Sequence, residues 1–286
     1  MNRPMRSEAV VNQPVIGELI AVDKGTLAEQ FSGAAGRYDD WATAQAEIAA
    51  QLMQQLPADF APSRMIDLGC GTGLLSAHLL KRYPQASLVG IDLAIGMVQH
   101  CRRHFAAEPA TAARAGFVVG DAEERAALVP HAELIASSCV AQWFADLPAT
   151  LRMWAQTLAP GGLMAFAFLL QGSFCELESA YYAALRRPFR GLRLPSPESI
   201  PRLFGASALH PVVCTEGTVT ARYDSSHEAL RSFRKIGAVF QGQPGHQSLA
   251  PAAVRRLISF YDRHLDSEGL APVTHRVQYV IAERSR

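Results

Sequence analysis

The sequence predicts an α/β fold in which helices cover both faces of a parallel sheet. Short apolar runs alternate five times with stretches of helical periodicity between residues 64 and 170. A glycine-rich turn follows the first of these runs, as it does where a parallel strand leads into a helix around a bound ligand. The chain has 286 residues, of which 49% are hydrophobic, so it can bury a large core without disulfides or a metal.

The predicted elements follow one another in a regular order. Helical spacing places Leu27, Phe31 and Tyr38 on one face near the N-terminus, and helical spacing resumes over 42–56. Apolar runs then predict buried strands at 64–68, 88–92, 116–120, 134–138 and 163–170. Helices are predicted between them at 74–83, 97–105 and 151–158, the last closed by Pro160-Gly161-Gly162. Beyond residue 170 strands and helices no longer alternate regularly. Helices are expected there at 176–187, 224–239 and 251–265, a strand at 212–220, and an antiparallel strand at 276–282.

Composition excludes several classes of protein. A hydrophobic chain with a net charge of +1 is not disordered, and it offers nucleic acid little phosphate attraction. Its five cysteines are scattered without a C-x-x-C pair, which favours a reducing compartment. The longest apolar run, 163–170, is far shorter than the ~20 residues of a membrane span. We therefore expect a soluble, cytoplasmic protein that binds neither membrane nor nucleic acid.

Charge is unevenly distributed along the chain. Acidic residues are in excess over 1–150 and basic residues over 151–286, where Arg186, Arg187 and Arg190 form one cluster. Such clusters are usually solvated helix faces. They also fit a docking surface that steers an acidic partner into place, and the sequence leaves both interpretations open.

The glycine-rich turn identifies a ligand site. Asp67 precedes Gly69, Gly71 and Gly73 where a strand meets a helix, so bare N–H groups can approach a ligand. Asp92 ends the next strand, where a carboxylate can accept both hydroxyls of a ribose. The spacing does not match the dinucleotide fingerprint G-x-G-x-x-G, and no Gly-Lys-Ser/Thr follows to make a P-loop.

The pattern resembles motif I of the class I S-adenosylmethionine-dependent methyltransferases, in which the loop faces the methionine part of the cofactor. Asp121-Ala122 follows the third predicted strand, where this superfamily contacts the adenine amino group. The resemblance implies a Rossmann-like fold with a mostly parallel seven-stranded sheet, S-adenosyl-L-methionine as cofactor, and a helical lid in the C-terminal part. Together with the missing periodicity before residue 26 and the change of pattern after residue 170, it divides the chain into four parts. These are a flexible tail (1–25), a cofactor-binding core with N-terminal helices (26–170), a substrate-binding helical lid with one remaining core strand (171–272), and the last strand of the sheet (273–286).

Further motifs are similar to those of the malonyl-acyl-carrier-protein O-methyltransferases of biotin synthesis. The matching segments are 31–39 with Gln45, 92–97, 137–143, 171–177, 194–198, 232–238 and 272–274. Two positions depart from the family pattern: Ser138 stands where asparagine is expected, and Glu133 where aspartate is usual. Neither residue has to carry out chemistry, although the contact made near Ser138 then differs from that of the family.

The family resemblance implies methyl transfer to the free carboxylate of malonyl-acyl carrier protein. Carboxylates are ionised at pH 7, so no general base is expected, and catalysis rests on alignment and exclusion of water. The residues expected to position the reacting groups are Tyr38, Gln142, Trp143 and Ser173. The cofactor-binding residues are expected to be Tyr38, Gln45, Asp67, Gly69, Gly71, Gly73, Asp92, Leu93, Met97, Asp121, Ala122 and Ser138. Substrate contacts are expected from Trp143, Ser173, Arg234 and Lys235, and carrier-protein docking from Arg186, Arg187 and Arg190.

Several alternatives stay open at this stage. Malonyl-coenzyme A could replace the carrier-bound substrate, and the sequence leaves the oligomeric state unknown. A small-molecule carboxyl, O- or N-methyltransferase of the same fold is the second hypothesis, and a non-catalytic cofactor-binding module is the third. No metal is expected: His100 and His104 have i, i+4 spacing, but the glutamate of the H-E-x-x-H pattern is absent.

Overall fold

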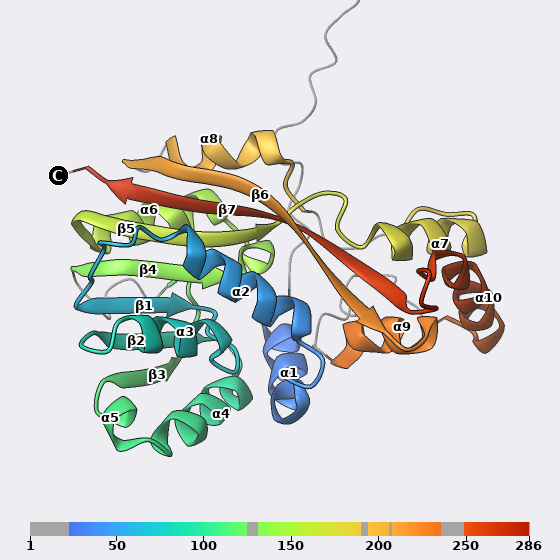
Figure 1. Ribbon diagram of the computed structural model, residues 1–286, viewed down its shortest axis with the longest axis horizontal. Helices are drawn as coiled ribbons and strands as arrows, with labels where there is room; N and C mark the ends of the chain where they lie inside the picture. The colour runs from blue at the N-terminus through green and yellow to red at the C-terminus, as the bar shows by residue number, and fades with distance from the viewer. Residues whose placement is uncertain (1–22, 125–130, 190–193, 206–207, 236–248, 286) are drawn as a thin grey trace, which may run out of the picture.

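A computed structural model describes residues 23–124, 131–189, 194–205, 208–235 and 249–285, with the side chain of Arg234 also outside the description (Figure 1). Seven strands form one sheet in the order β3-β2-β1-β4-β5-β7-β6. Strand β7 runs opposite to the other six strands, so the predicted α/β fold with a mostly parallel sheet is confirmed. The strands are β1 (Arg64–Leu68), β2 (Ser87–Asp92), β3 (Ala115–Val119), β4 (Ala132–Ser138), β5 (Leu158–Leu169), β6 (Leu209–Tyr223) and β7 (Ala271–Arg284).

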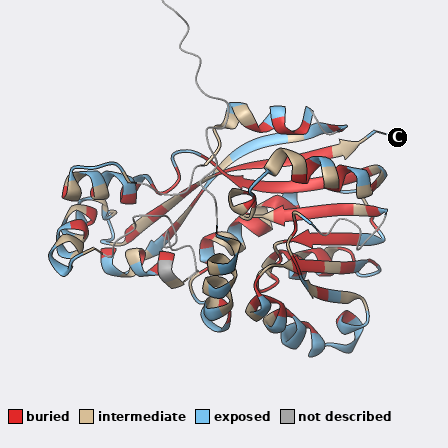
Figure 2. Ribbon diagram, turned by 180° about the vertical axis from the view of Figure 1, so that it is seen from behind, coloured by how far each residue is buried: buried red, intermediate tan, exposed pale blue. Residues whose placement is uncertain are grey.

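Helices cover both faces of this sheet, whose central strands are buried (Figure 2). One hydrophobic cluster joins the sheet to α2, α3 and α4, and a second joins the opposite face to α6 and α8. Trp154 of α6 is completely buried in the second cluster, and its indole N–H donates to the carbonyl of Ala122. The described helices are α1 (Lys24–Ala34), α2 (Thr43–Gln55), α3 (Leu74–Arg82), α4 (Ile95–Ala106), α5 (Pro109–Ala112), α6 (Leu147–Thr157), α7 (Cys175–Leu185), α8 (Ile200–Gly205), α9 (Ser226–Lys235) and α10 (Pro251–Tyr261).

The C-terminal part differs from a simple lid. The long strands β6 and β7 pair along their whole length and reach beyond the rest of the sheet, where α7, α9 and α10 gather (Figure 1). Helix α8 also lies within the predicted lid segment 171–272, but it packs on the sheet with α6 and β6. Of the helices in the segment predicted to form a lid, α7, α9 and α10 lie at the far end of the paired strands β6 and β7 (Figure 1).

Most predicted elements lie within a few residues of their observed positions. Strand β1 spans 64–68 as predicted, whereas β5 begins at Leu158 rather than 163. The tripeptide Pro160-Gly161-Gly162 lies inside β5, where the pairing with β4 shifts register, so it forms a strand irregularity rather than only a helix stop. The predicted tail 1–25 lies outside the described residues up to 22, and Lys24 and Gly25 already belong to α1.

Candidate functional site

The glycine loop shapes the floor of a pocket at the carboxyl end of β1. All three glycines have positive φ, at 67° for Gly69, 55° for Gly71 and 95° for Gly73. A Cβ on Gly69 would lie 2.5 Å from the side chain of Val140, and one on Gly73 would lie 2.6 Å from the ring of Phe105. A Cβ on Gly71 would meet nothing within 4 Å. Gly69 and Gly73 are thus required for packing, whereas Gly71 leaves open space where a ligand can approach the backbone.

Asp92 ties the loop to the end of β2. One carboxylate oxygen accepts from the N–H of Gly71 at 2.8 Å, and the other accepts from the N–H of Ala94 at 2.8 Å. Burial raises the pKa of Asp92, and these two hydrogen bonds oppose that rise. Each oxygen keeps a further lone pair, so the carboxylate can hold the loop and still accept from ligand hydroxyls.

Asp67 lies near the end of β1, just before the glycine loop. Its carboxylate accepts from the hydroxyl of Ser76 at 2.6 Å and is 1% exposed. Burial raises its pKa to about 7, the Ser76 hydrogen bond opposes that rise, and the nearby charge of Asp92 adds to it. A cationic group in the pocket would favour the ionised form.

This raised pKa predicts a pH-dependent affinity for a cationic ligand of the loop. Below pH 7 the ligand must displace a proton from Asp67, so affinity is expected to rise about tenfold from about pH 6 to about pH 8. Calorimetric titration across this range with S-adenosylmethionine, the sulfonium cofactor that the sequence motifs lead us to expect, measures the effect. Asp67→Asn should bind more weakly, with little pH dependence, and an equally steep profile in that variant would contradict the assignment.

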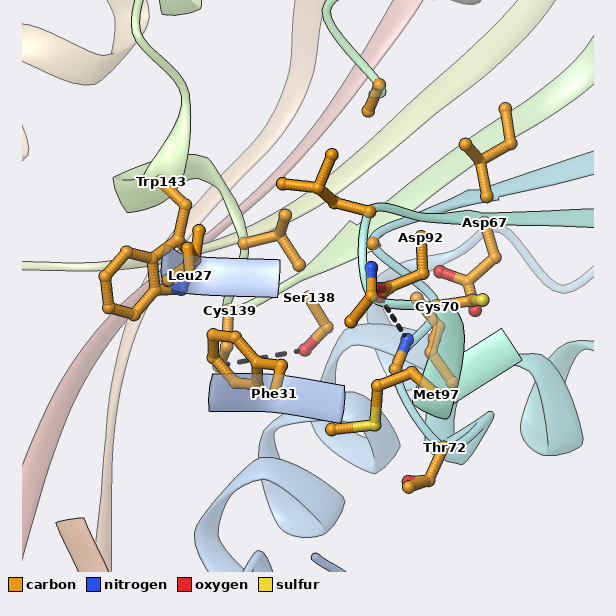
Figure 3. A pocket seen from close by; sticks show the side chains of 18 of the residues that line it. Leu27, Phe31, Asp67, Cys70, Thr72, Asp92, Met97, Ser138, Cys139 and Trp143 are labelled. Carbon is orange, nitrogen blue, oxygen red and sulfur yellow. Dashed lines mark hydrogen bonds between the residues drawn. The ribbon is translucent and has the colours of Figure 1, made fainter. Parts of the chain in front are cut away.

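Helix α1 covers the pocket from the N-terminal side. Leu27, Ala28 and Phe31 line it, and the Phe31 ring meets Trp143 edge-on with centroids 5.8 Å apart. Figure 3 shows Leu27, Phe31 and Trp143 grouped on one side of the pocket and Asp67 and Asp92 on the other. The enclosed space, including its opening to solvent, is about 1010 Å³. This size and apolar cover suit a nucleoside with a charged side chain.

The structure brings most of the predicted cofactor residues together. Those that line the pocket are Tyr38, Gln45, Asp67, Gly69, Gly71, Asp92, Leu93, Met97, Asp121, Ala122 and Ser138, together with Trp143 from the predicted substrate set. Gly73 packs against Phe105 instead and is outside the lining. Sequence reasoning missed other lining residues, among them Lys24, Leu27, Ala28, Phe31, Thr72 and Cys139. The apolar helix face before Tyr38 was the available signal for Leu27 and Phe31.

Two of the predicted positioning residues do not line the pocket. The side-chain amide of Gln142 donates to the carbonyl of Cys139 at 2.7 Å, and its own oxygen is buried without a partner. Cys139 has a left-handed backbone, with φ at 57°, so Gln142 braces the turn that brings Ser138 and Cys139 into the pocket. The Ser173 hydroxyl accepts from the N–H of Arg276 at 2.9 Å and donates to its carbonyl at 3.1 Å. Both residues act on backbone, and direct contacts with substrate stay predictions.

Two of the titratable side chains that line the pocket, Cys139 and Tyr38, keep their protons at neutral pH. Burial raises the pKa of the Cys139 thiol to about 12, against the hydrogen bond with Ser138. Burial also raises the pKa of the Tyr38 hydroxyl, with smaller contributions from Cys139, Asp92 and Asp39. At neutral pH these two side chains are neutral donors and cannot serve as a general base.

Of the basic residues predicted to contact substrate or partner, the three whose side chains the structure describes are absent from the pocket lining, namely Arg186, Arg187 and Lys235. Arg186 and Arg187 are exposed at the end of α7, and the Arg187 guanidinium lies 5.7 Å from the Tyr181 ring centroid. Arg190 lies outside the described residues, as does the side chain of Arg234. Lys235 is half-buried at the end of α9.

The histidine pair has a local structural explanation. The rings of His100 and His104 stack with centroids 6.3 Å apart, and His100 Nε2 lies 3.9 Å from Asp39 Oδ2. Within the described ranges, no group of three or more His, Cys, Asp or Glu residues could hold a metal ion. None of the helices in the described parts of the chain combines the length and apolar composition that a membrane crossing requires.

The comparisons with known proteins agree with this geometry. A methyltransferase-domain family model matches residues 65–162. The malonyl-acyl-carrier-protein O-methyltransferase of Dechloromonas aromatica is 33% identical over 91% of this chain and 95% of its own length. The biotin biosynthesis bifunctional protein BioCD of Bordetella avium is 34% identical over 83% of this chain and 49% of its own. The crystal structure of YcgJ from Bacillus subtilis has a TM-score of 0.56 at 16% identity, covering 84% of this chain and 99% of that one.

The fold and the pocket define a class I S-adenosylmethionine-dependent methyltransferase. The residues present fit this cofactor, since Gly71 leaves backbone open beside two acidic acceptors, Asp92 and Asp121, under an apolar cover. More narrowly, the chain belongs to the malonyl-acyl-carrier-protein O-methyltransferase family. The resemblance predicted from the sequence motifs is thereby confirmed.

Proposed function

We propose that this enzyme methylates the free carboxylate of malonyl-acyl carrier protein to its methyl ester, an early step in making the pimeloyl moiety of biotin. The observation that supports the proposal most directly is the match to a curated relative of that name along 95% of the relative's length. Esterification removes the negative charge at the end of the acyl chain, so later chain-extending enzymes meet an apolar terminus.

The pocket supplies alignment and a dry environment rather than acid–base chemistry. The bound cofactor supplies an electrophilic methyl group, and the acceptor carboxylate, with a pKa near ~4, is already ionised at neutral pH. Gly71 and Asp92 hold the loop that receives the cofactor, and α1 excludes water with Leu27 and Phe31. Tyr38 and Cys139 remain protonated at the pocket floor, where donors can orient an anion without taking its proton.

The acceptor site is proposed to lie between this floor and the lid. Trp143 lines the pocket, and Lys235 and Arg234 end α9 on the lid. Ser173 is proposed to act indirectly, because its hydroxyl clamps β7 and so fixes the start of α7 relative to the sheet. A modest cation suits this task, since a strongly paired arginine would stabilise the carboxylate before reaction.

The partner and the compartment belong to the same proposal. Malonyl-acyl carrier protein is the proposed substrate, with malonyl-coenzyme A as the competing donor of the same acid. The five cysteines are all free thiols, which fits the reducing cytoplasm.

Transfer from radiolabelled S-adenosylmethionine tests the function. The enzyme should place a base-labile methyl ester on malonyl-acyl carrier protein and none on the carrier without malonyl. Turnover of a free acid alone would indicate a small-molecule methyltransferase, and cofactor binding without turnover on any carboxylate would indicate a non-catalytic module. Growth of a biotin auxotroph lacking this step, once supplied with the gene, gives the cellular test.

Charge reversal on the lid tests carrier docking. Arg186 and Arg187 are exposed directly after α7, and Arg190 follows them in the sequence. If they attract an acidic carrier protein, changing all three to Glu should raise the apparent KM for malonyl-acyl carrier protein about tenfold or more, most strongly at low salt. KM for malonyl-coenzyme A should stay nearly constant, and an equal loss on both substrates would show a structural role.

A further inference from the structure

Lys24 occupies an unexpected place at the mouth of the cofactor pocket. It is the first residue of α1, and its Nζ donates to Oδ2 of Asp121 and to Oε2 of Glu123. The lysine side chain is 29% exposed, and those of its partners are 17% and 11% exposed. These ion pairs therefore join the helix that covers the pocket to the acidic end where the adenine amino group is expected.

Glu123 is a fixed anchor for the lysine. Its carboxylate also accepts from the backbone N–H of Ala145 at 2.9 Å, from the N–H of Asp146 at 2.9 Å and from the Thr150 hydroxyl at 3.1 Å. Burial opposes ionisation of Glu123, but the hydrogen bonds from Lys24 and from these two N–H groups outweigh it and lower its pKa. An ionised, firmly held carboxylate gives Lys24 an attachment point on the core.

The other attachments of α1 to the core gather near its C-terminal end. None of its residues is fully buried, although Phe31 meets Trp143 and the Ser32 hydroxyl accepts from the N–H of Gly96 at 3.2 Å. These contacts lie toward the C-terminal half of the helix. Among the described residues, Lys24 supplies the charged attachment of the N-terminal half. A helix with little buried apolar surface opens locally at low cost, so two partly buried ion pairs form a large share of what holds it closed.

We propose that Lys24 is a cofactor-retaining residue: its ion pairs with Asp121 and Glu123 latch α1 over the adenosine end of the pocket and slow the exchange of cofactor and by-product. This role goes beyond the proposed function and rests on the cofactor class alone, not on the identity of the methyl acceptor. Retention would keep the pocket covered while the carrier-bound substrate arrives.

Dissociation of S-adenosylhomocysteine provides the test. Its rate is measured by stopped-flow tryptophan fluorescence after displacement with excess S-adenosylmethionine, since Trp143 lines the pocket. Lys24→Met should release the nucleoside about tenfold faster than the wild type. Lys24→Arg should restore slow release, and Lys81→Met, a matched change at an exposed lysine on α3, should have no effect. Rising salt should speed release from the wild type and leave Lys24→Met nearly unchanged.

The helix itself gives a second measurement. Without ligand, chymotrypsin should cleave after Leu27 or Phe31 faster in Lys24→Met than in the wild type, while the global melting temperature stays within the range of Lys81→Met. Unchanged release and unchanged cleavage in Lys24→Met would overturn the proposal, as would equal acceleration in the control. A wild type that binds S-adenosylhomocysteine but methylates no malonyl substrate would refute the proposed function and leave this latch intact.

Discussion

Replacing Asp92 with alanine is expected to raise the dissociation constant for S-adenosylmethionine by about 10- to 150-fold, as for the loss of a charged hydrogen-bond pair worth about 1.5–3 kcal/mol. The loss of affinity has two physical causes. The carboxylate is the expected acceptor for the ribose hydroxyls, and it also holds the glycine loop through the N–H of Gly71 at 2.8 Å. Calorimetric titration of the purified variant measures the change in affinity.

The stability of Asp92→Ala should change much less than its affinity. The substitution strands two N–H groups, but it also removes a buried carboxylate whose pKa is raised by burial. Asp92→Asn keeps one acceptor oxygen and should bind with intermediate affinity, and the exposed Asp59→Ala serves as control. Wild-type affinity in Asp92→Ala would remove this residue from the cofactor site.

Replacing Gly96 with alanine is expected to weaken cofactor binding at least about tenfold by lifting α1 from the pocket. Gly96 lies on α4 directly beneath α1, and an added Cβ would be 2.5 Å from the carbonyl oxygen of Ser32 and 2.7 Å from its Cα. Those atoms are backbone, so no rotamer change relieves the clash, and the covering helix must move. Calorimetric titration should show the weaker binding, and chymotrypsin should cleave α1 faster than in the wild type.

A second glycine provides the matched control for Gly96→Ala. Gly33 lies on α1 itself, and a Cβ there would meet nothing within 4 Å. Gly33→Ala should leave affinity unchanged or tighten it slightly, because alanine favours the helix by up to about 1 kcal/mol. If both substitutions weaken binding alike, helix propensity rather than docking against α4 is the cause.

The sheet and the glycine loop could be predicted because their signals are local. Strand β1 is a short, mostly apolar run with Asp67 next to its last residue, and one crossover helix fixes the spacing from Gly69 to Asp92. Residues at the carboxyl ends of parallel strands must meet at one edge, so Asp67, Asp92 and Asp121 converge on one pocket. For these three residues, their places at the ends of successive parallel strands were enough to predict that they lie close together.

The residues that were missed depend on contacts between distant segments. Lys24 meets Asp121 across 97 positions of sequence, and nothing in its own surroundings indicates a partner. Ser173 meets Arg276 across 103 positions, so a residue of a family motif proves to hold backbone rather than line the pocket. The left-handed turn at Cys139 is likewise invisible in the sequence, because a non-glycine residue gives no sign of positive φ.

The place of β7 between β5 and β6 bears on how this protein is made. Ribosomes synthesise β6 (Leu209–Tyr223) before β7 (Ala271–Arg284), yet β6 pairs within the sheet only through β7. A nascent chain ending before Ala271 therefore leaves a long strand without its hydrogen-bonding partner and β5 with one open side. The sheet cannot be completed until residues 271–284 have been translated. Chains that are shortened so that they end before residue 271 should therefore be prone to aggregation.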